Sequence, residues 1–210
     1  MNKALISTLL GLAFSVNAHA TIITVEPDSF ANGLDISNAT VGVSLQMETG
    51  NSVYAYGTGD TNYASTGTKV FGYDAGLGFG VEPFWDNQDI FRATFSALAD
   101  YVAIDVINNN GAGQGTDNAY MEVFGTDGLL TTIPSSSIGF PGYQTLSFQS
   151  VSANISYIRL SNLGGSDFNL DRLQFGNNIP NNIPEPGSLA LMGIGLLGYF
   201  SRRERQGSAV

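Results

Sequence analysis

The side chains of this chain that could carry out chemistry are nearly all carboxylates. The single histidine, His19, lies in an N-terminal segment with the features of a removable leader, and the chain contains no cysteine. Without an imidazole or a thiol, the remainder lacks the parts of a serine or cysteine nucleophile and of a histidine-based zinc site. The chemistry left open is glycoside hydrolysis, which uses two carboxyl groups flanking the bond that breaks.

Two pairs of acids are candidates for that chemistry. Asp86 and Asp89 stand beside Trp85, and Asp105 and Glu122 lie on segments that we expect to be neighbouring strands. In a chain with many acids some pair always seems suitable, and a solvated acidic face is the simpler interpretation. We therefore expect no catalytic residue, and we keep a carbohydrate-active hydrolase with a carboxylate pair as the alternative function.

Acidic residues dominate the stretch between residues 21 and 183. Of the eighteen acids in the chain only Glu185 and Glu204 lie outside it, whereas only four of the eight basic residues lie inside, which gives this stretch a net charge of −12. Such a surface repels nucleic acid and anionic lipid and attracts divalent cations. Because there is no cysteine, the stretch depends on its core, or on bound metal, for stability. We expect no nucleic-acid partner.

Flat aromatic rings beside hydrogen-bonding groups are typical of contacts with sugars. The segment Phe84-Trp85-Asp86-Asn87 has this composition, and further aromatic rings come from Tyr54, Tyr56, Tyr63 and Tyr73. A lone tryptophan in a β-sandwich is more often a core residue. Two interpretations therefore stay open for Trp85, a glycan contact and a core side chain.

The elements that position these residues are predicted to be strands. Short runs rich in β-branched and aromatic residues alternate with Gly, Asn, Asp and Ser, and no window of helical period and length occurs between 21 and 183. The expected strands are 41–47, 90–95, 101–107, 119–124, 143–148, 155–160 and 170–175. This pattern predicts an all-β domain over 21–176, an antiparallel β-sandwich or jelly roll. Alternation places on its core side Val102, Ile104, Val106, Leu173 and Phe175.

Three intervening segments are expected to be irregular. The glycine-rich stretch 57–80 is interpreted as a loop between strands, and 111–115 as a hairpin loop. Residues 177–183 are interpreted as a linker.

The N-terminus has the pattern of a signal peptide. A lysine at position 3 precedes an apolar stretch, and the small residues Ala18 and Ala20 flank His19 as in a signal-peptidase site. We expect residues 1–20 to be removed and the mature chain to begin at Thr21. The chain is therefore expected to be exported.

The C-terminus has three parts. Pro184, Glu185 and Pro186 precede an uncharged apolar segment, 187–200, and a basic cluster follows at Arg202, Arg203 and Arg205, before a short extension, 206–210. As a helix, 187–200 extends about 21 Å, which is short of a bilayer core of about 30 Å. We expect a short hydrophobic helix that enters the inner membrane transiently, although a retained anchor remains the alternative.

This arrangement over residues 184–205 resembles the sorting tail of the PEP-CTERM proteins. The resemblance implies export in a Gram-negative bacterium that makes exopolysaccharide, and recognition of the tail by an exosortase, which processes it near Pro-Glu-Pro. It implies a location in the cell envelope, at the outer surface or in the extracellular matrix. It covers the tail and leaves the role of the domain open.

A second resemblance covers the domain itself. Segments 30–39, 42–45, 95–106 and 168–175 are similar in order and pattern to jelly-roll domains of the carbohydrate-binding type. The resemblance implies a structural calcium ion held by an early acidic loop and an acid on the last strand, for which Asp35 and Asp171 are the candidates. The alternative for Asp171 is an ion pair with Arg159 or Arg172, or exposure to water.

Together these features predict a non-enzymatic exported protein of the envelope or biofilm matrix. Its expected role is structural or adhesive, with extracellular polysaccharide as a partner.

Overall fold

The computed structural model describes residues 21–74, 80–110, 116–162 and 167–177. Within them almost all regular structure is strand, and every paired strand is antiparallel. The predicted signal peptide, the linker beyond 177, the sorting tail and its apolar helix lie outside the described residues. In the described part of the chain, no helix has the length and apolar character needed to span a membrane.

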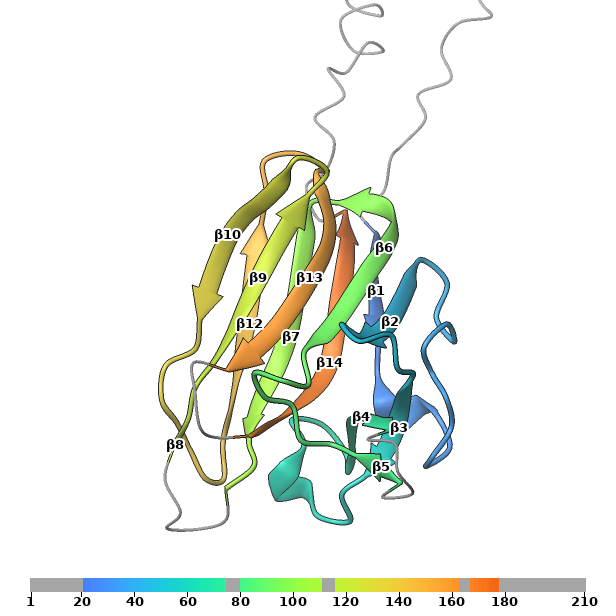
Figure 1. Cartoon of the computed structure of the whole chain (residues 1–210), viewed down its shortest axis with the longest axis vertical. Coiled ribbons are helices and arrows are strands. Elements are labelled where there is room, and N and C mark those ends of the chain that lie inside the picture. The colour runs from blue at the N-terminus through green and yellow to red at the C-terminus, as the bar shows by residue number, and fades with distance from the viewer. Residues whose placement is uncertain (1–20, 75–79, 111–115, 163–166, 178–210) are drawn as a thin grey trace, which may run out of the picture. The chain divides into compact units, whose positions relative to one another are not determined.

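Two sheets pack face to face as a β-sandwich (Figure 1). In the described residues the larger sheet has seven strands in the order β12-β7-β14-β4-β3, with β1 beside β14 and β5 beside β4. Its members are β1 (Thr21–Val25), β3 (Val53–Gly57), β4 (Lys69–Asp74), β5 (Val81–Glu82), β7 (Tyr101–Asn108), β12 (Tyr143–Gln149) and β14 (Phe168–Asn177).

The second sheet contains five described strands in the order β10-β9-β13-β6-β2. These are β2 (Val43–Met47), β6 (Phe91–Ala99), β9 (Ala119–Gly125), β10 (Gly128–Pro134) and β13 (Ile155–Asn162). Small elements connect them: β8 (Thr116–Asp117) pairs with β11 (Ile138–Gly139), and two 3-10 turns are η2 (Pro27–Ser29) and η3 (Thr61–Tyr63).

Period-two alternation explains which side chains form the core. In β9, Ala119, Met121 and Val123 are buried while the residues between them are partly exposed. The predicted core positions on β7 and β14 are confirmed, because Val102, Ile104, Val106, Leu173 and Phe175 all belong to the one buried cluster. Residues 21–179 form a compact unit with this core as its own, and such a unit is expected to fold independently.

A bulge in β14 sets the outward side of the larger sheet. The pairing with β7 shifts between Asp171 and Gln174, and Arg172 within the shift has a φ of 41°. Because the bulge adds one residue, Leu170 and Leu173 both face the core although they are three residues apart. Asn169 and Asp171 then point to the outer side, where the functional candidates gather.

The predicted all-β sandwich is confirmed, as are the seven predicted strands within a few residues at their ends. The prediction for 57–80 is wrong. This stretch contains β4, and Val70 and Phe71 in it are fully buried. Its glycines obscured the period-two pattern of the strand. Gly72 occupies a position where a Cβ would lie 2.8 Å from both Tyr56 Cβ and Val81 Cγ1, so no larger side chain fits there.

Candidate functional site

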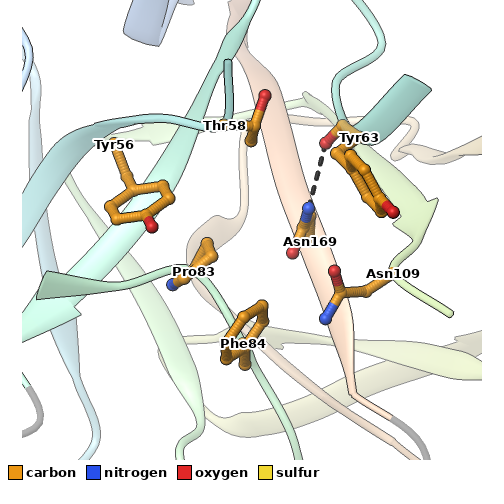
Figure 2. Close-up of a pocket in the computed structure, with 7 residues that line it drawn as sticks. All are labelled: Tyr56, Thr58, Tyr63, Pro83, Phe84, Asn109 and Asn169. Carbon is orange, nitrogen blue, oxygen red and sulfur yellow. Dashed lines mark hydrogen bonds between the residues drawn. The ribbon is translucent and has the colours of Figure 1, made fainter. Parts of the chain in front are cut away.

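A cavity of about 340 Å³ lies on the outer side of the larger sheet. Its volume is at the lower end of the range for small-molecule sites. Segments far apart in sequence build it, as Figure 2 shows: strand β3, the loop that carries η3, the segment after β5, the end of β7, and β14. The lining residues are Tyr56, Thr58, Tyr63, Pro83, Phe84, Asn109 and Asn169.

Three aromatic rings form the walls of this cavity. Tyr56 is partly exposed on β3, Tyr63 lies in η3, and the Phe84 side chain is 39 % exposed. Behind Tyr63 stands Phe140, with the two ring centroids 5.2 Å apart. These rings offer apolar surface within a solvent-accessible cavity. Sugar rings pack their own apolar faces against aromatic surfaces of this kind.

Asn169 supplies a polar group at the base of the cavity. The residue is 1 % exposed, and its Nδ2 donates to the backbone oxygen of Tyr63 at 3.0 Å. A carbonyl oxygen only accepts, so this bond fixes the orientation of the amide. The other end, Oδ1, is buried and has no hydrogen-bond partner within the described part of the chain. A buried unpaired acceptor is unfavourable by about 1–3 kcal/mol. Because solvent does not reach Oδ1, a ligand hydroxyl could donate to it only after neighbouring side chains move.

The cavity itself is uncharged, in contrast to the acidic domain around it. Its lining consists of aromatic, amide, hydroxyl and proline side chains. All four basic side chains of the described residues form ion pairs: Lys69 with Asp28, Arg92 with Glu48, Arg159 with Glu48 and Glu122, and Arg172 with Asp105. The arrangement is suited to a neutral, hydroxyl-rich ligand and repels anionic ones.

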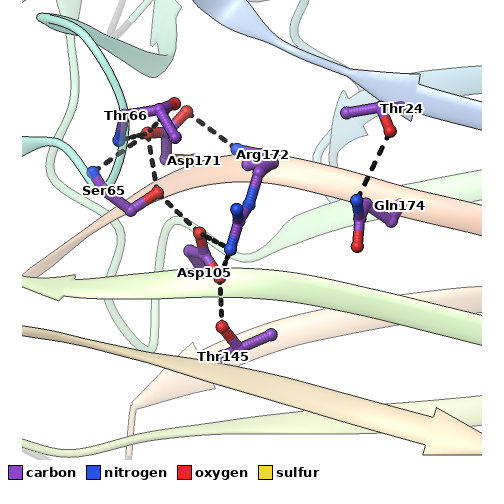
Figure 3. A network of polar contacts seen from close by, with 8 residues as sticks. All are labelled: Thr24, Ser65, Thr66, Asp105, Thr145, Asp171, Arg172 and Gln174. Carbon is purple, nitrogen blue, oxygen red and sulfur yellow. Dashed lines mark hydrogen bonds and ion pairs between the residues drawn. The ribbon is translucent and has the colours of Figure 1, made fainter.

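The loop that carries Tyr63 is fastened to β14 by Asp171 (Figure 3). Asp171 Oδ2 accepts from Ser65 N and Thr66 N at 3.0 Å each, and the hydroxyls of the same two residues lie at 2.9 and 3.2 Å. Its Oδ1 accepts from Arg172 N at 2.7 Å. We call these residues, with Asp105, the loop clasp.

Asp105 extends the clasp into the sheet. It is fully buried, and its carboxylate receives Ser65 Oγ and Thr145 Oγ1 at 2.6 Å each. Arg172 Nη2 lies 2.9 Å from Asp105 Oδ2 and neutralises the charge. Two buried carboxylates are thereby satisfied by hydroxyls, backbone amides and one guanidinium.

Glu26 lies against this network from the end of β1. Burial and the negative charge of Asp171 raise the pKa of Glu26 from 4.5 to about 7. Burial also raises the pKa of Asp171, against hydrogen bonds from Thr66, Ser65 and Arg172 that lower it. The closeness of the two carboxyl groups therefore disfavours the state in which both are ionised.

The prediction of a glycan contact at Trp85 is wrong. The indole is fully buried among core aromatics, 5.2 Å from Phe91 and 4.8 Å from Tyr73 between ring centroids. Its Nε1 donates to the backbone oxygen of Phe71 at 2.8 Å. Trp85 is the core side chain of the alternative interpretation, and its neighbour Phe84 is the one that lines the cavity.

The two predicted calcium ligands do not form a site together. Asp35 is exposed beside Tyr54, and its carboxylate accepts from Ser37 N at 2.9 Å, whereas Asp171 belongs to the loop clasp. Burial raises the pKa of Asp35, but the hydrogen bonds from Ser37 and Ser52 together outweigh it and leave the pKa below its ordinary value. Across the described residues no cluster of three or more acids is arranged to hold a metal. The alternative for Asp171 is also wrong, because Asp171 is fully buried and the guanidinium groups of Arg159 and Arg172 pair with other acids.

The carboxylate pairs proposed for hydrolysis are engaged in other contacts. Asp105 is on β7 and Glu122 on β9, in different sheets, so the expectation that their strands are neighbours is wrong. Asp86 Oδ1 accepts from the backbone N–H of Gln88 and Asp89, which forms a turn, and Asp89 Oδ2 accepts from Tyr73 at 2.6 Å.

Sequence reasoning had singled out three of the cavity residues, Tyr56, Tyr63 and Phe84, as aromatic candidates. It missed Thr58, Pro83, Asn109 and Asn169. The available signal was the alternation of β14, which places Asn169 opposite the core-facing Leu170, but the partner strand was hidden in the glycine-rich stretch.

The predicted sorting residues, Pro184, Glu185, Pro186, Arg202, Arg203 and Arg205, and the predicted processing residues Ala18 and Ala20, lie outside the described residues. A family model for the PEP-CTERM protein-sorting motif matches residues 182–206. The chain carries the PEP-CTERM motif. This motif marks an exported protein of the Gram-negative envelope and implies processing by an exosortase. No curated protein matches the PEP-CTERM chain in sequence.

Several solved structures are similar to this chain at low sequence identity. The K2 cleaved adhesin domain of Lys-gingipain is 13 % identical, with a TM-score of 0.45, and the match covers 74 % of this chain and 99 % of that one. The C-terminal CBM6 of a marine laminarinase from Zobellia galactanivorans is 12 % identical, with a TM-score of 0.34 over 74 % and 99 %. A CBM6 module of Clostridium stercorarium in complex with cellobiose is 16 % identical, with a TM-score of 0.30 over 74 % and 94 %.

Proposed function

We propose that the domain of this PEP-CTERM protein binds a neutral glycan in the cavity bounded by Tyr56, Tyr63 and Phe84. The observation that carries the proposal is a cavity that combines three aromatic rings with uncharged polar side chains, including Asn169. A sugar presents hydroxyl groups beside apolar C–H faces, so one ring contacts both the aromatic walls and the polar part of the lining.

The role is binding without catalysis. The acids of the candidate pairs are occupied in a turn, a tyrosine contact and ion pairs, which leaves them poorly suited to act as a general acid or nucleophile. Export through the sorting motif brings the domain to the compartment where exopolysaccharide is found. A structural or adhesive role in the envelope or matrix follows, with exopolysaccharide as the partner and exosortase as the processing enzyme.

Affinity electrophoresis of residues 21–179 through gels that contain neutral polysaccharides tests this function. Exopolysaccharide isolated from the producing organism serves as one gel and a gel without polysaccharide as the blank. We expect retardation that Phe84→Ala weakens about tenfold, because the exposed ring is lost while the Phe84 carbonyl that accepts from Tyr73 remains.

Tyr120→Ala is the matched control. Tyr120 is a partly exposed tyrosine on β9, in the other sheet, and its loss is expected to leave retardation unchanged. Equal retardation of the wild type and Phe84→Ala, or no retardation by any neutral polysaccharide, contradicts the proposed site.

A further inference from the structure

A second cavity, of about 360 Å³, lies at the neighbouring end of β3. It is lined by residues of the β2–β3 turn, of β3 itself and of the end of β4: Gly50, Asn51, Ser52, Tyr54 and Asp74. Asn51 Nδ2 donates to the backbone oxygen of Asp74 at 3.1 Å, which ties the turn to β4. The lining therefore offers one aromatic ring, polar groups and a carboxylate.

The two cavities share one strand. Tyr56 lines the first and Tyr54 the second, and both are partly exposed, whereas Val53 and Ala55 between and beside them are fully buried. Alternation in a strand places residues i and i+2 on the same side, about 6.6 Å apart. The two tyrosines therefore lie side by side on the outer surface of the sheet, at a spacing comparable to the length of one sugar residue.

The opposite position on β4 carries no side chain. Gly72 pairs with Tyr54 across the strands, and a Cβ there would lie 2.8 Å from Tyr56 Cβ and from Val81 Cγ1. Any larger residue at this position displaces Tyr56 or Val81. The glycine therefore lets both tyrosines keep their places on one surface, which runs along β3 from the first cavity to the second.

The charge of this surface selects among glycans. Asp74 is among the residues that line the second cavity. The domain has a large excess of acids, and its four basic residues are already in ion pairs. Uronic acids and sulfated sugars are repelled, whereas neutral hydroxyls donate to a carboxylate.

We infer that the two cavities are subsites of one binding surface along β3, and that the ligand is an internal segment of an extended neutral polysaccharide. This inference rests on the proposed glycan-binding function. Sugar residues in the first cavity contact Tyr56 and Phe84, and residues further along the same chain contact Tyr54 and Asp74.

Isothermal titration of residues 21–179 with neutral oligosaccharide ladders tests the inference. The probes are β-1,3-glucan, β-1,4-glucan, β-1,4-galactan and α-1,6-glucan series from disaccharide to octasaccharide, with an oligouronate ladder as the anionic comparison. We expect Kd to fall as the chain lengthens beyond what the first cavity holds, and we expect no binding of oligouronates. Tyr54→Ala is expected to weaken long oligosaccharides about tenfold and to leave the short ones unchanged.

The variants separate this inference from the function on which it rests. Phe84→Ala is expected to weaken short and long oligosaccharides alike, and Tyr120→Ala to change neither. If Tyr54→Ala leaves the affinity for long chains unchanged while Phe84→Ala lowers it, the second subsite is refuted and the first stands. If no neutral ladder binds and no neutral polysaccharide retards the domain, both ideas are refuted.

Discussion

Replacing Glu26 by glutamine is expected to make the stability of the domain less dependent on pH. Glu26 has its pKa raised to about 7 in the fold, because it is partly buried and lies against the Asp171 carboxylate. Between its ordinary value of 4.5 and about 7, the folded protein holds this proton more tightly than the unfolded chain does. The stabilisation is fully present below pH 4.5 and is lost as the pH rises through 7.

The size of the effect follows from the same shift. A difference of this size corresponds to roughly 3 kcal/mol of unfavourable ionisation. Solvent screens a partly exposed carboxyl, and we expect about 1–2 kcal/mol after that allowance. Glutamine resembles the protonated acid and cannot ionise, so Glu26→Gln is expected to equal the wild type near pH 4.5 and to exceed its stability by about 1–2 kcal/mol at pH 8.

Urea unfolding of residues 21–179 at intervals from pH 4.5 to 8 measures this difference. Comparing variant with wild type at each pH cancels much of the titration of the other acids, and Asp127→Asn, in the exposed β9–β10 turn, controls for the change in net charge. If the difference between Glu26→Gln and the wild type is the same at every pH, or if the variant is less stable at pH 8, the raised pKa of Glu26 in the fold is refuted.

Two further substitutions test the outer side of the larger sheet by the same unfolding measurement. Arg172→Met leaves the buried Asp105 carboxylate without its cation and is expected to lower the free energy of unfolding by about 2–3 kcal/mol at pH 7; a loss under 0.5 kcal/mol would show that the hydroxyls alone satisfy Asp105. Gly72→Val crowds Tyr56 Cβ and is expected to lower the free energy of unfolding by about 1–3 kcal/mol. It is also expected to weaken the binding of long oligosaccharides most. Unchanged stability would show that β3 and β5 can move apart to accommodate the larger side chain.

Much of the sandwich was predictable because half-buried strands leave a period-two pattern. The alternation of β7 identified its core positions without any knowledge of its partners. Strands β3 and β4 were not predicted, because their glycines and tyrosines do not give a clear period-two pattern. Gly72 is required by the close approach of neighbouring strands, which is a tertiary contact that the sequence does not reveal.

The cavity was less predictable than the sheet. Its aromatic members have a composition that indicates sugar contact, but the decisive polar group, Asn169, meets Tyr63 across 106 positions of sequence. The same separation hides the clasp, where Asp171 binds Ser65 and Thr66. Trp85 and its neighbour Phe84 differ in exposure because they lie on opposite sides of one short segment, which composition alone does not reveal.

The order in which the strands are synthesised differs from their order in space. β14 comes last in the described domain, yet it pairs with β1, β4 and β7 in the interior of the larger sheet. Until residues 168–177 have been made, β1 has no described partner and the clasp lacks Asp171, which accepts from the backbone N–H groups of Ser65 and Thr66. The sorting motif begins at residue 182, so the strand that completes the sheet and the signal that addresses the protein leave the ribosome almost together. A chain that terminates before β14 is complete therefore lacks both a central strand of the larger sheet and the sorting motif.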